Sequence, residues 1–159
     1  MGKELQLVGF RIGRETFGVP IGLVREIVRM MEITAVPEAP DYVEGVINLR
    51  GRIIPVIDLR KRFREPGITS DKRNRILVAE LEGRLVGLIV DAASEVLKIA
   101  QGEIEPPPEL LQENDLSYVT GLGKRNGKLI ILVDVQKLMS RGELGRLSEL
   151  SEWQPTGTA

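Results

Sequence analysis

The sequence predicts a mainly β protein made of two similar small β-units in tandem. Three observations support this prediction. The apolar runs are short and rich in β-branched residues, two-residue turns join neighbouring runs, and the second half of the chain repeats a pattern of the first. A length of 159 residues suits one ordinary domain or two very small ones.

The first half opens with a predicted hairpin. Residues 5–12 read as a strand, and residues 16–19 pair back on it after a turn at 13–15. The apolar spacing then changes to i, i+3, i+4, i+7, which predicts a short helix whose apolar face is Val24, Ile27, Val28 and Met31.

The strongest hairpin signal lies between residues 45 and 59. Two β-rich runs, 45–49 and 52–59, flank the two-residue turn Arg50-Gly51. Pro55 cannot donate a hydrogen bond to a β-ladder, so its strand is predicted to be an edge strand or to carry a bulge.

The second half repeats this alternation of strands and turns. Residues 76–81 and 85–90 predict one hairpin, and residues 119–123 and 128–135 predict another. The turn of the later hairpin contains Asn126-Gly127, a pair that tolerates the backbone angles of a tight turn.

Three segments of the second half are not predicted to be strands. Residues 91–97 predict a short helix or a bend, and the prolines of 105–109 predict a stiff, extended connector. After Asp134 the pattern turns helical, and a C-terminal helix is expected over 141–153.

An internal repeat relates the two halves. Residues 42–58 resemble residues 118–134, and the matching Tyr, Gly and Asp residues all stand 76 positions apart. Farther upstream, Gly87 follows Gly18 by 69 positions, so a single insertion in the proline-containing connector reconciles the halves. Two unrelated apolar hairpins can also look alike, but a constant offset favours a true repeat.

The repeat suggests how the domain is divided. We expect one domain over 1–159, with a first subdomain at roughly 14–74 and a second at 75–140, joined by the N-terminal strand and the C-terminal helix. Units of about 60–70 residues are near the lower limit for an independent core. They should therefore share apolar surface and leave a groove between them where a partner can bind.

Composition excludes several kinds of chemistry. The chain has no cysteine and no histidine, so disulfides, thiolate nucleophiles and Ser-His-Asp catalysis are excluded. A net charge of −1 and 4% aromatic residues argue against nucleic acid as the main partner. No bound metal or cofactor is expected. The chain lacks an apolar run of membrane-spanning length or a signal peptide, so we expect it in the cytoplasm.

Four charged residues stand at positions that suggest a specific role. Asp58 and Asp134 occupy equivalent repeat positions after apolar strands, where a carboxylate pair for catalysis is conceivable but a helix N-cap is the simpler interpretation. Arg50 lies in a tight turn and Glu26 on the polar side of the predicted helix. Both are either solvated surface charges or part of a binding surface.

The segment from Gly45 to Leu59 carries the pattern Asn-Leu-Arg-Gly-x-x-x-Pro-Val-x-Asp-Leu. This pattern resembles the signature of the CheW family of chemotaxis coupling proteins. Shorter segments are similar to the family in the same order, and together they cover about residues 4–140: these are 17–21, 24–27, 86–91, 118–123 and 132–134.

The resemblance implies a fold and a function. Family members have two five-stranded SH3-like β-barrels packed around a common core, and they are adaptors without catalysis or cofactors. They connect the cytoplasmic tips of chemoreceptors to the regulatory domain of the histidine kinase CheA, and they help to build the signalling array at the membrane. The resemblance therefore implies a protein that is monomeric when free and is recruited to the membrane only through receptors.

The resemblance also implies roles for individual residues. The receptor-binding groove would be lined by Val24, Ile27, Val28, Val86, Val90 and Ala93. The kinase-binding face would use Ile21, Glu44, Gly45 and Leu49, with a second kinase contact near Glu105 and Leu110. We further predict that Arg50 and Glu26 pair in the folded protein and set the geometry of the interface.

Two alternatives remain open at this point. The same fold forms the regulatory domain of CheA-type kinases. An unrelated SH3-like barrel that binds peptide or nucleic acid would usually show an aromatic-lined groove or a basic face, and the sequence pattern shows neither.

Overall fold

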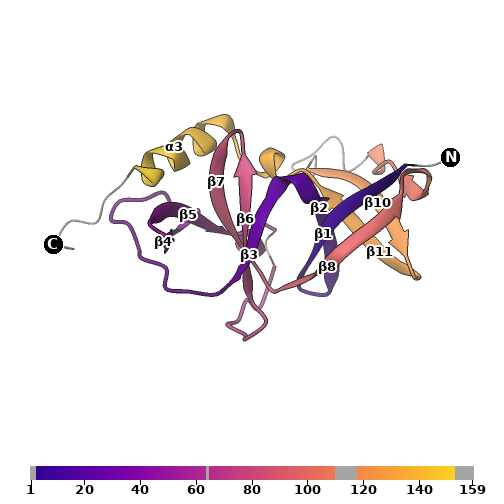
Figure 1. Ribbon diagram of the computed structural model, residues 1–159, viewed down its shortest axis with the longest axis horizontal. Coiled ribbons are helices and arrows are strands. Elements are labelled where there is room, and N and C mark those ends of the chain that lie inside the picture. The colour runs from indigo at the N-terminus through magenta and orange to yellow at the C-terminus, as the bar shows by residue number, and fades with distance from the viewer. Residues whose placement is uncertain (1–2, 64, 110–117, 153–159) are drawn as a thin grey trace.

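The computed structural model describes residues 3–63, 65–109 and 118–152. Two β-sheets lie side by side along the long axis of the molecule (Figure 1). The first sheet has the strand order β3-β6-β7-β5-β4. Its strands are β3 (Val24–Arg29), β4 (Val43–Leu49), β5 (Arg52–Asp58), β6 (Arg75–Leu81) and β7 (Arg84–Val90).

The second sheet has the strand order β8-β1-β2-β11-β10-β9. Its strands are β1 (Glu4–Ile12), β2 (Glu15–Pro20), β8 (Ala92–Ala100), β9 (Ile104–Glu105), β10 (Val119–Arg125) and β11 (Lys128–Val133). Three short helices connect strands in the described part of the chain, namely the 3-10 helices η1 (Ile21–Leu23) and η2 (Gln101–Glu103) and the α-helix α1 (Leu59–Arg62). The 3-10 helix η3 (Val135–Leu138) and the α-helix α3 (Arg141–Ser151) follow β11.

The strand pairing does not follow the predicted division at residues 74 and 75. β6 and β7 pair with strands of the first half, and β1 and β2 pair with strands of the second half. In Figure 1 the second sheet combines the indigo of β1 and β2 with the orange of β10 and β11, whereas the first sheet runs from purple to pink. A sequence repeat identifies similar segments, but it does not identify the strands with which they pair.

The mainly β class and the shared core are confirmed, but the barrel description is not. Neither sheet closes on itself: the first ends at β3 and β4, and the second ends at β8 and β9. The second sheet has six strands rather than five, because β9 adds to the edge of β10 through Leu122 and Gly123.

Two predicted helical segments are strands in the structure. The segment predicted as a helix from residue 24 contains β3, whose residues alternate between half-buried and exposed. Residues 91–97 fall largely within β8, which pairs along β1. A register shift between Val24 and Glu26 turns Val24 toward the main core and Val28 toward the smaller cluster of the first sheet, and strand pairing suits these β-branched residues better than a helix. The expected C-terminal helix is confirmed as α3, which begins with a capping box between Ser140 and Glu143.

Pro55 lies in an interior strand, so the edge-strand alternative is wrong, whereas a register shift does occur in the ladder between β4 and β5, at Val43 and Gly45. Pro55 has no amide hydrogen to donate. The parallel ladder between β5 and β7 begins at Val56, one residue later, so this ladder does not need a donor at Pro55. The predicted tight turns are confirmed. Arg50 and Gly51 both have positive φ angles, of 52° and 86°, and Asn126 and Gly127 have φ angles of 52° and 77°.

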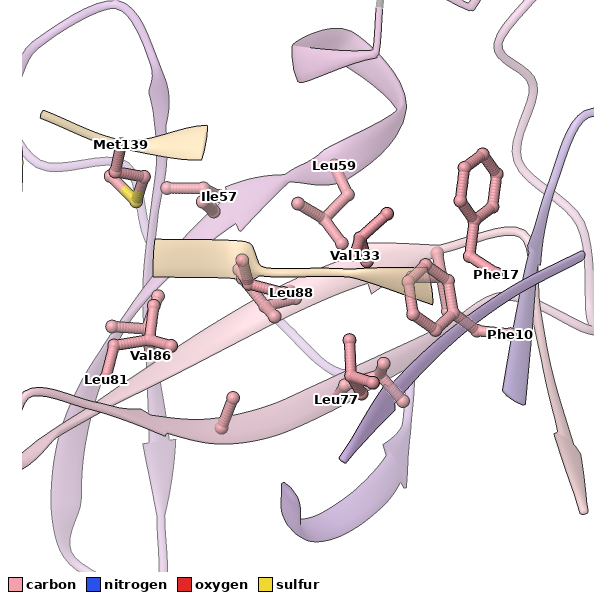
Figure 2. Close-up of a cluster of buried hydrophobic side chains, with 14 of the residues drawn as sticks. Phe10, Phe17, Ile57, Leu59, Leu77, Leu81, Val86, Leu88, Val133 and Met139 are labelled. Carbon is pink, nitrogen blue, oxygen red and sulfur yellow. The ribbon is translucent and has the colours of Figure 1, made fainter. Parts of the chain in front are cut away.

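The main hydrophobic core joins the two sheets. Figure 2 shows side chains of the second sheet, including Phe10 and Phe17, beside side chains of the first sheet, including Leu77 and Leu88. Leu144 and Leu147 of α3 are also buried in this core. Each sheet also has a smaller cluster of its own. Because the sheets bury apolar residues in common, neither is expected to fold alone.

Candidate interaction site at the tip of the first sheet

The β4–β5 hairpin ends in a turn that an ion pair joins to β3. The Arg50 guanidinium donates to the Glu26 carboxylate, as predicted from the family resemblance. Within the turn, the Gly51 amide donates to the side-chain oxygen of Asn48 at 2.9 Å. The Arg50 side chain is 69% exposed, so the ion pair adds only about 0–1 kcal/mol to stability. Its main effect is to hold the turn against β3.

A surface cavity of about 450 Å³ lies beside this ion pair, and we call it the first cavity. A second ion pair, between Arg25 of β3 and Glu80 of β6, also lines this cavity. The lining combines these paired charges with apolar side chains, and consists of Arg25, Glu26, Leu49, Arg50, Arg52, Ile54, Val78, Glu80, Gly83 and Leu85. Three cations face two carboxylates here, so the cavity is nearly neutral and partly apolar. This mixture suits contact with another protein.

The residues expected at the kinase-binding face are spread over β4 and its surroundings. Leu49 lines the first cavity, whereas Ile21 lies in η1 and is 37% exposed. Glu44 forms an ion pair with Lys61 of α1, with a carboxylate oxygen 2.8 Å from the lysine nitrogen. Leu49 and Glu44 are half-buried, and both have surface available to a partner.

Gly45 has a backbone role that explains its presence independently of any partner. Its φ angle is +148°, in a region that side chains rarely adopt, and β4 has a register shift here. An added Cβ would overlap the carbonyl oxygen of Thr34, whose backbone bonds to Val46 on β4. Gly45 is buried, so it shapes the strand rather than presenting a side chain.

One of the two residues expected at a second kinase contact, Glu105, lies in the other sheet. Glu105 is exposed on β9 and pairs with Leu122 of β10. Leu110 lies outside the described residues.

The expected receptor groove is only partly accessible. Ile27 is 41% exposed, and Val24, Val28 and Ala93 are half-buried. Val86 and Val90, in contrast, are 0% exposed and belong to the main core.

Figure 2 shows Val86 packed near Leu81 and Leu88. A direct contact between Val86 or Val90 and a partner is inconsistent with this burial, because β7 is an interior strand whose side chains fill the core.

A buried polar cluster connects the two sheets, and sequence reasoning missed it. We call Asp58, Arg60, Asn74 and Asp91 the junction cluster. Arg60 donates twice to Asp58, at 2.9 Å from Nε and from Nη2, and its Nη1 donates to Asp91 at 3.2 Å. The hydrogen bond to Asp58 raises the pKa of Arg60, so the guanidinium stays charged although its side chain is only 7% exposed.

Asp91 links this cluster to the second sheet. Its other carboxylate oxygen accepts from the Gly13 amide at 2.7 Å, and its own amide donates to the Arg11 carbonyl at 3.0 Å. Asp91 stands between β7 and β8, where the chain passes from one sheet to the other. The cluster therefore helps to set how the two sheets meet. The sequence feature that could have indicated this cluster is Asp58-Leu59-Arg60, which stands at the end of β5.

The N-cap interpretation of both aspartates is confirmed. Asp58 accepts from the Arg60 amide at 2.9 Å, and Asp134 accepts from the Gln136 amide at 3.0 Å. The two belong to different sheets, and Asp58 already holds a guanidinium. Among the described residues, no group of three or more acidic, cysteine or histidine side chains is placed to bind a metal ion. The described part of the chain also holds no helix long and apolar enough to cross a membrane.

The fold and this surface define a two-sheet β-domain whose distinctive residues lie at a hairpin tip. The profile of the CheW-like domain matches residues 6–143. The chemotaxis protein CheW of Klebsiella aerogenes is 36% identical over 152 residues, which cover 96% of this chain and 90% of that protein. CheW of Helicobacter pylori is 39% identical over 141 residues, covering 86% of this chain and 82% of that protein.

A solved structure agrees with the sequence relatives. The scaffolding protein TtCheW from Thermoanaerobacter tengcongensis superimposes with a TM-score of 0.79 at 41% identity, covering 89% of this chain and 96% of that one. The chain belongs to the CheW family.

Proposed function

We propose that this protein is a non-catalytic chemotaxis adaptor that couples chemoreceptor tips to the kinase CheA in a membrane-associated array. Membership of the CheW family supports the adaptor role. The observation that carries the coupling proposal is the signature hairpin, because its tip is exposed and Glu26 holds it beside the first cavity. Under this proposal, CheA binds the hairpin side of the first sheet.

The test of the kinase contact is a calorimetric titration with the isolated regulatory domain of CheA from the same genome. We expect saturable 1:1 binding by the wild type and loss of binding in Leu49→Glu. Val96→Glu is the control, because Val96 is an exposed apolar residue of the other sheet that lines neither this cavity nor the corresponding one of its own sheet. Binding that survives Leu49→Glu would place the contact elsewhere. No binding by folded wild-type protein would contradict the coupling proposal.

For the receptor, we propose docking of a helical tip along β3, next to Val24, Ile27, Val28 and Ala93. Ile27 supports this location, because it is a large apolar residue exposed on an edge strand. Val96 provides a matched control: it stands 69 positions later on β8, the corresponding edge strand, and is 45% exposed.

The measurement is co-sedimentation with a receptor cytoplasmic fragment. Ile27→Glu should abolish it and Val96→Glu should leave it intact. Equal loss in both variants would argue against a site specific to β3.

A further inference from the structure

The tip of the second sheet carries a cavity that corresponds to the first cavity by the internal repeat. We call it the second cavity. Its volume is about 620 Å³, and it lies between the β1–β2 and β10–β11 hairpins. Lys128 and Ile130 stand 76 positions after Arg52 and Ile54, which line the first cavity.

The charge of the two cavities is different. Four cationic residues line the second cavity, Arg11, Arg14, Arg125 and Lys128, and only one carboxylate, that of Glu15. The repeat places Arg11 where the first cavity has Glu80, and Arg125 where it has Leu49. A carboxylate and a leucine are thus replaced by two guanidinium groups. A concave surface lined by charges of one sign concentrates groups of the opposite sign.

The cationic side chains of the second cavity also have fewer ion-pair partners than those of the first cavity. In the first cavity, Arg25 and Arg50 each hold a glutamate. Among side chains the structure describes, no ion pair is formed by the four cationic residues of the second cavity. Nη1 of Arg125 is buried and has no hydrogen-bond partner there. A guanidinium that lacks acceptors is costly to bury, so Arg125 favours an added carboxylate partner.

We propose that the second cavity binds an acidic segment of a partner protein, with glutamate or aspartate carboxylates on Arg125 and Lys128. An apolar contact belongs to the same surface, because Leu129 is 45% exposed and lines the cavity with Leu97. The partner segment therefore combines carboxylates with an apolar residue. Nucleic acid is disfavoured, because none of the lining residues is aromatic.

The linear sequence shows no basic face, and the reason is geometric. Arg11 and Arg14 belong to the first hairpin of the chain, whereas Arg125 and Lys128 belong to the last. The parallel pairing of β2 with β11 brings these hairpins together. The net charge of −1 conceals the local excess of positive charge.

The test is fluorescence anisotropy with a short labelled peptide of glutamate and leucine, and with a lysine–leucine peptide as control. We expect the wild type to bind only the acidic peptide, with affinity that falls as salt rises. Lys128→Glu and Arg14→Glu should weaken binding by about tenfold, since each reverses one charge at the site.

Arg52→Glu is the matched control, because it makes the same charge change at the equivalent position of the first cavity. It should change the affinity by less than about twofold. Equal weakening by Arg52→Glu and Lys128→Glu would overturn the proposal in favour of general electrostatic attraction. Failure of the wild type to bind, or tighter binding of a single-stranded oligonucleotide than of the acidic peptide, would also overturn it.

Discussion

The two sheets share a strand order, but they differ just beyond the equivalent strands β5 and β11. After β5, Arg60 enters the junction cluster and binds Asp58 and Asp91. After β11, the equivalent residue is Gln136, and the equivalent space is a mostly apolar cavity of about 330 Å³ lined partly by Leu7, Leu132 and Gln136. An aspartate caps the following helix in both places, Asp58 before α1 and Asp134 before η3.

This difference shows which parts of the repeat are structural and which are specialised. The N-cap, the tight turn and the register shift recur in both units because each unit needs them to form a strand pair and a helix start. Of the two equivalent positions, only residue 60 after β5 carries a guanidinium, and it is buried where the chain's crossing at Asp91 brings the two sheets together. The hairpin tips differ as well, because one cavity has paired charges and the other has an excess of cations.

The largest expected effect is at the junction cluster. Arg60→Ala leaves Asp58 buried without its cation, which should cost about 3–5 kcal/mol of the free energy of unfolding. Gln136→Ala at the equivalent position should cost less than about 1 kcal/mol, because no buried charge loses its partner. Urea unfolding measures both.

Arg60→Lys provides an intermediate case, because it keeps the charge but loses the two-point contact with Asp58. Similar losses for Arg60→Ala and Gln136→Ala would show that the cluster does not stabilise the junction.

The next effect compares two equivalent glycines on β4 and β10. Gly45→Ala combines backbone strain with overlap of the Thr34 carbonyl, and should cost about 3 kcal/mol. Gly121→Ala brings a Cβ to 2.9 Å from a methyl group of Ile104, a side chain that can shift, and should cost about 1 kcal/mol. Thermal unfolding of both variants tests this order. A larger loss for Gly121→Ala would contradict it.

A smaller effect on stability is expected at the start of α3, the helix that follows the second unit. Burial raises the pKa of Glu143, but hydrogen bonds from the Ser140 amide and from Arg62 outweigh burial, so the pKa lies below its ordinary value. The folded protein therefore favours the charged carboxylate. This stabilisation is complete above the pKa of the unfolded chain and is lost as pH falls through the lower folded pKa.

Glu143→Gln should accordingly lower stability by about 1 kcal/mol at neutral pH and flatten its dependence on acidic pH. Chemical unfolding between neutral and acidic pH measures the difference. Glu149→Gln, an exposed site on the same helix, is the control. An unchanged pH dependence in Glu143→Gln would show that the capping box does not carry the effect.

The smallest effect on stability is expected for the exposed ion pair at the first hairpin tip. Arg50→Glu should lower the melting temperature by less than about 5 °C, because exposed pairs contribute about 0–1 kcal/mol. Under the proposed coupling function, it should nevertheless weaken CheA binding, since it releases the turn from β3. A double-mutant cycle with Glu26→Lys, read by calorimetric binding, tests the pairing. A larger fall in melting temperature would assign Arg50 a structural role instead.

Much of the local structure could be predicted from the sequence. The turns at Arg50-Gly51 and Asn126-Gly127, the caps at Asp58 and Asp134, and the helix α3 were all predictable, because each depends on a few neighbouring residues. The Arg50–Glu26 pair was predictable from the family resemblance. The β3 segment was wrongly predicted to be a helix, because short apolar spacings fit both a helix and a strand.

The sequence alone determined the class of fold, the repeat and the signature hairpin, since these are written in residue types and their spacing. Only the tertiary structure decided that β1 and β2 pair with the second half while β6 and β7 pair with the first. It also decided that Val86 and Val90 are buried, and that four cations from two distant hairpins share one cavity. Pairing partners and local charge depend on long-range contacts, and these form only when apolar surface from both halves is buried together.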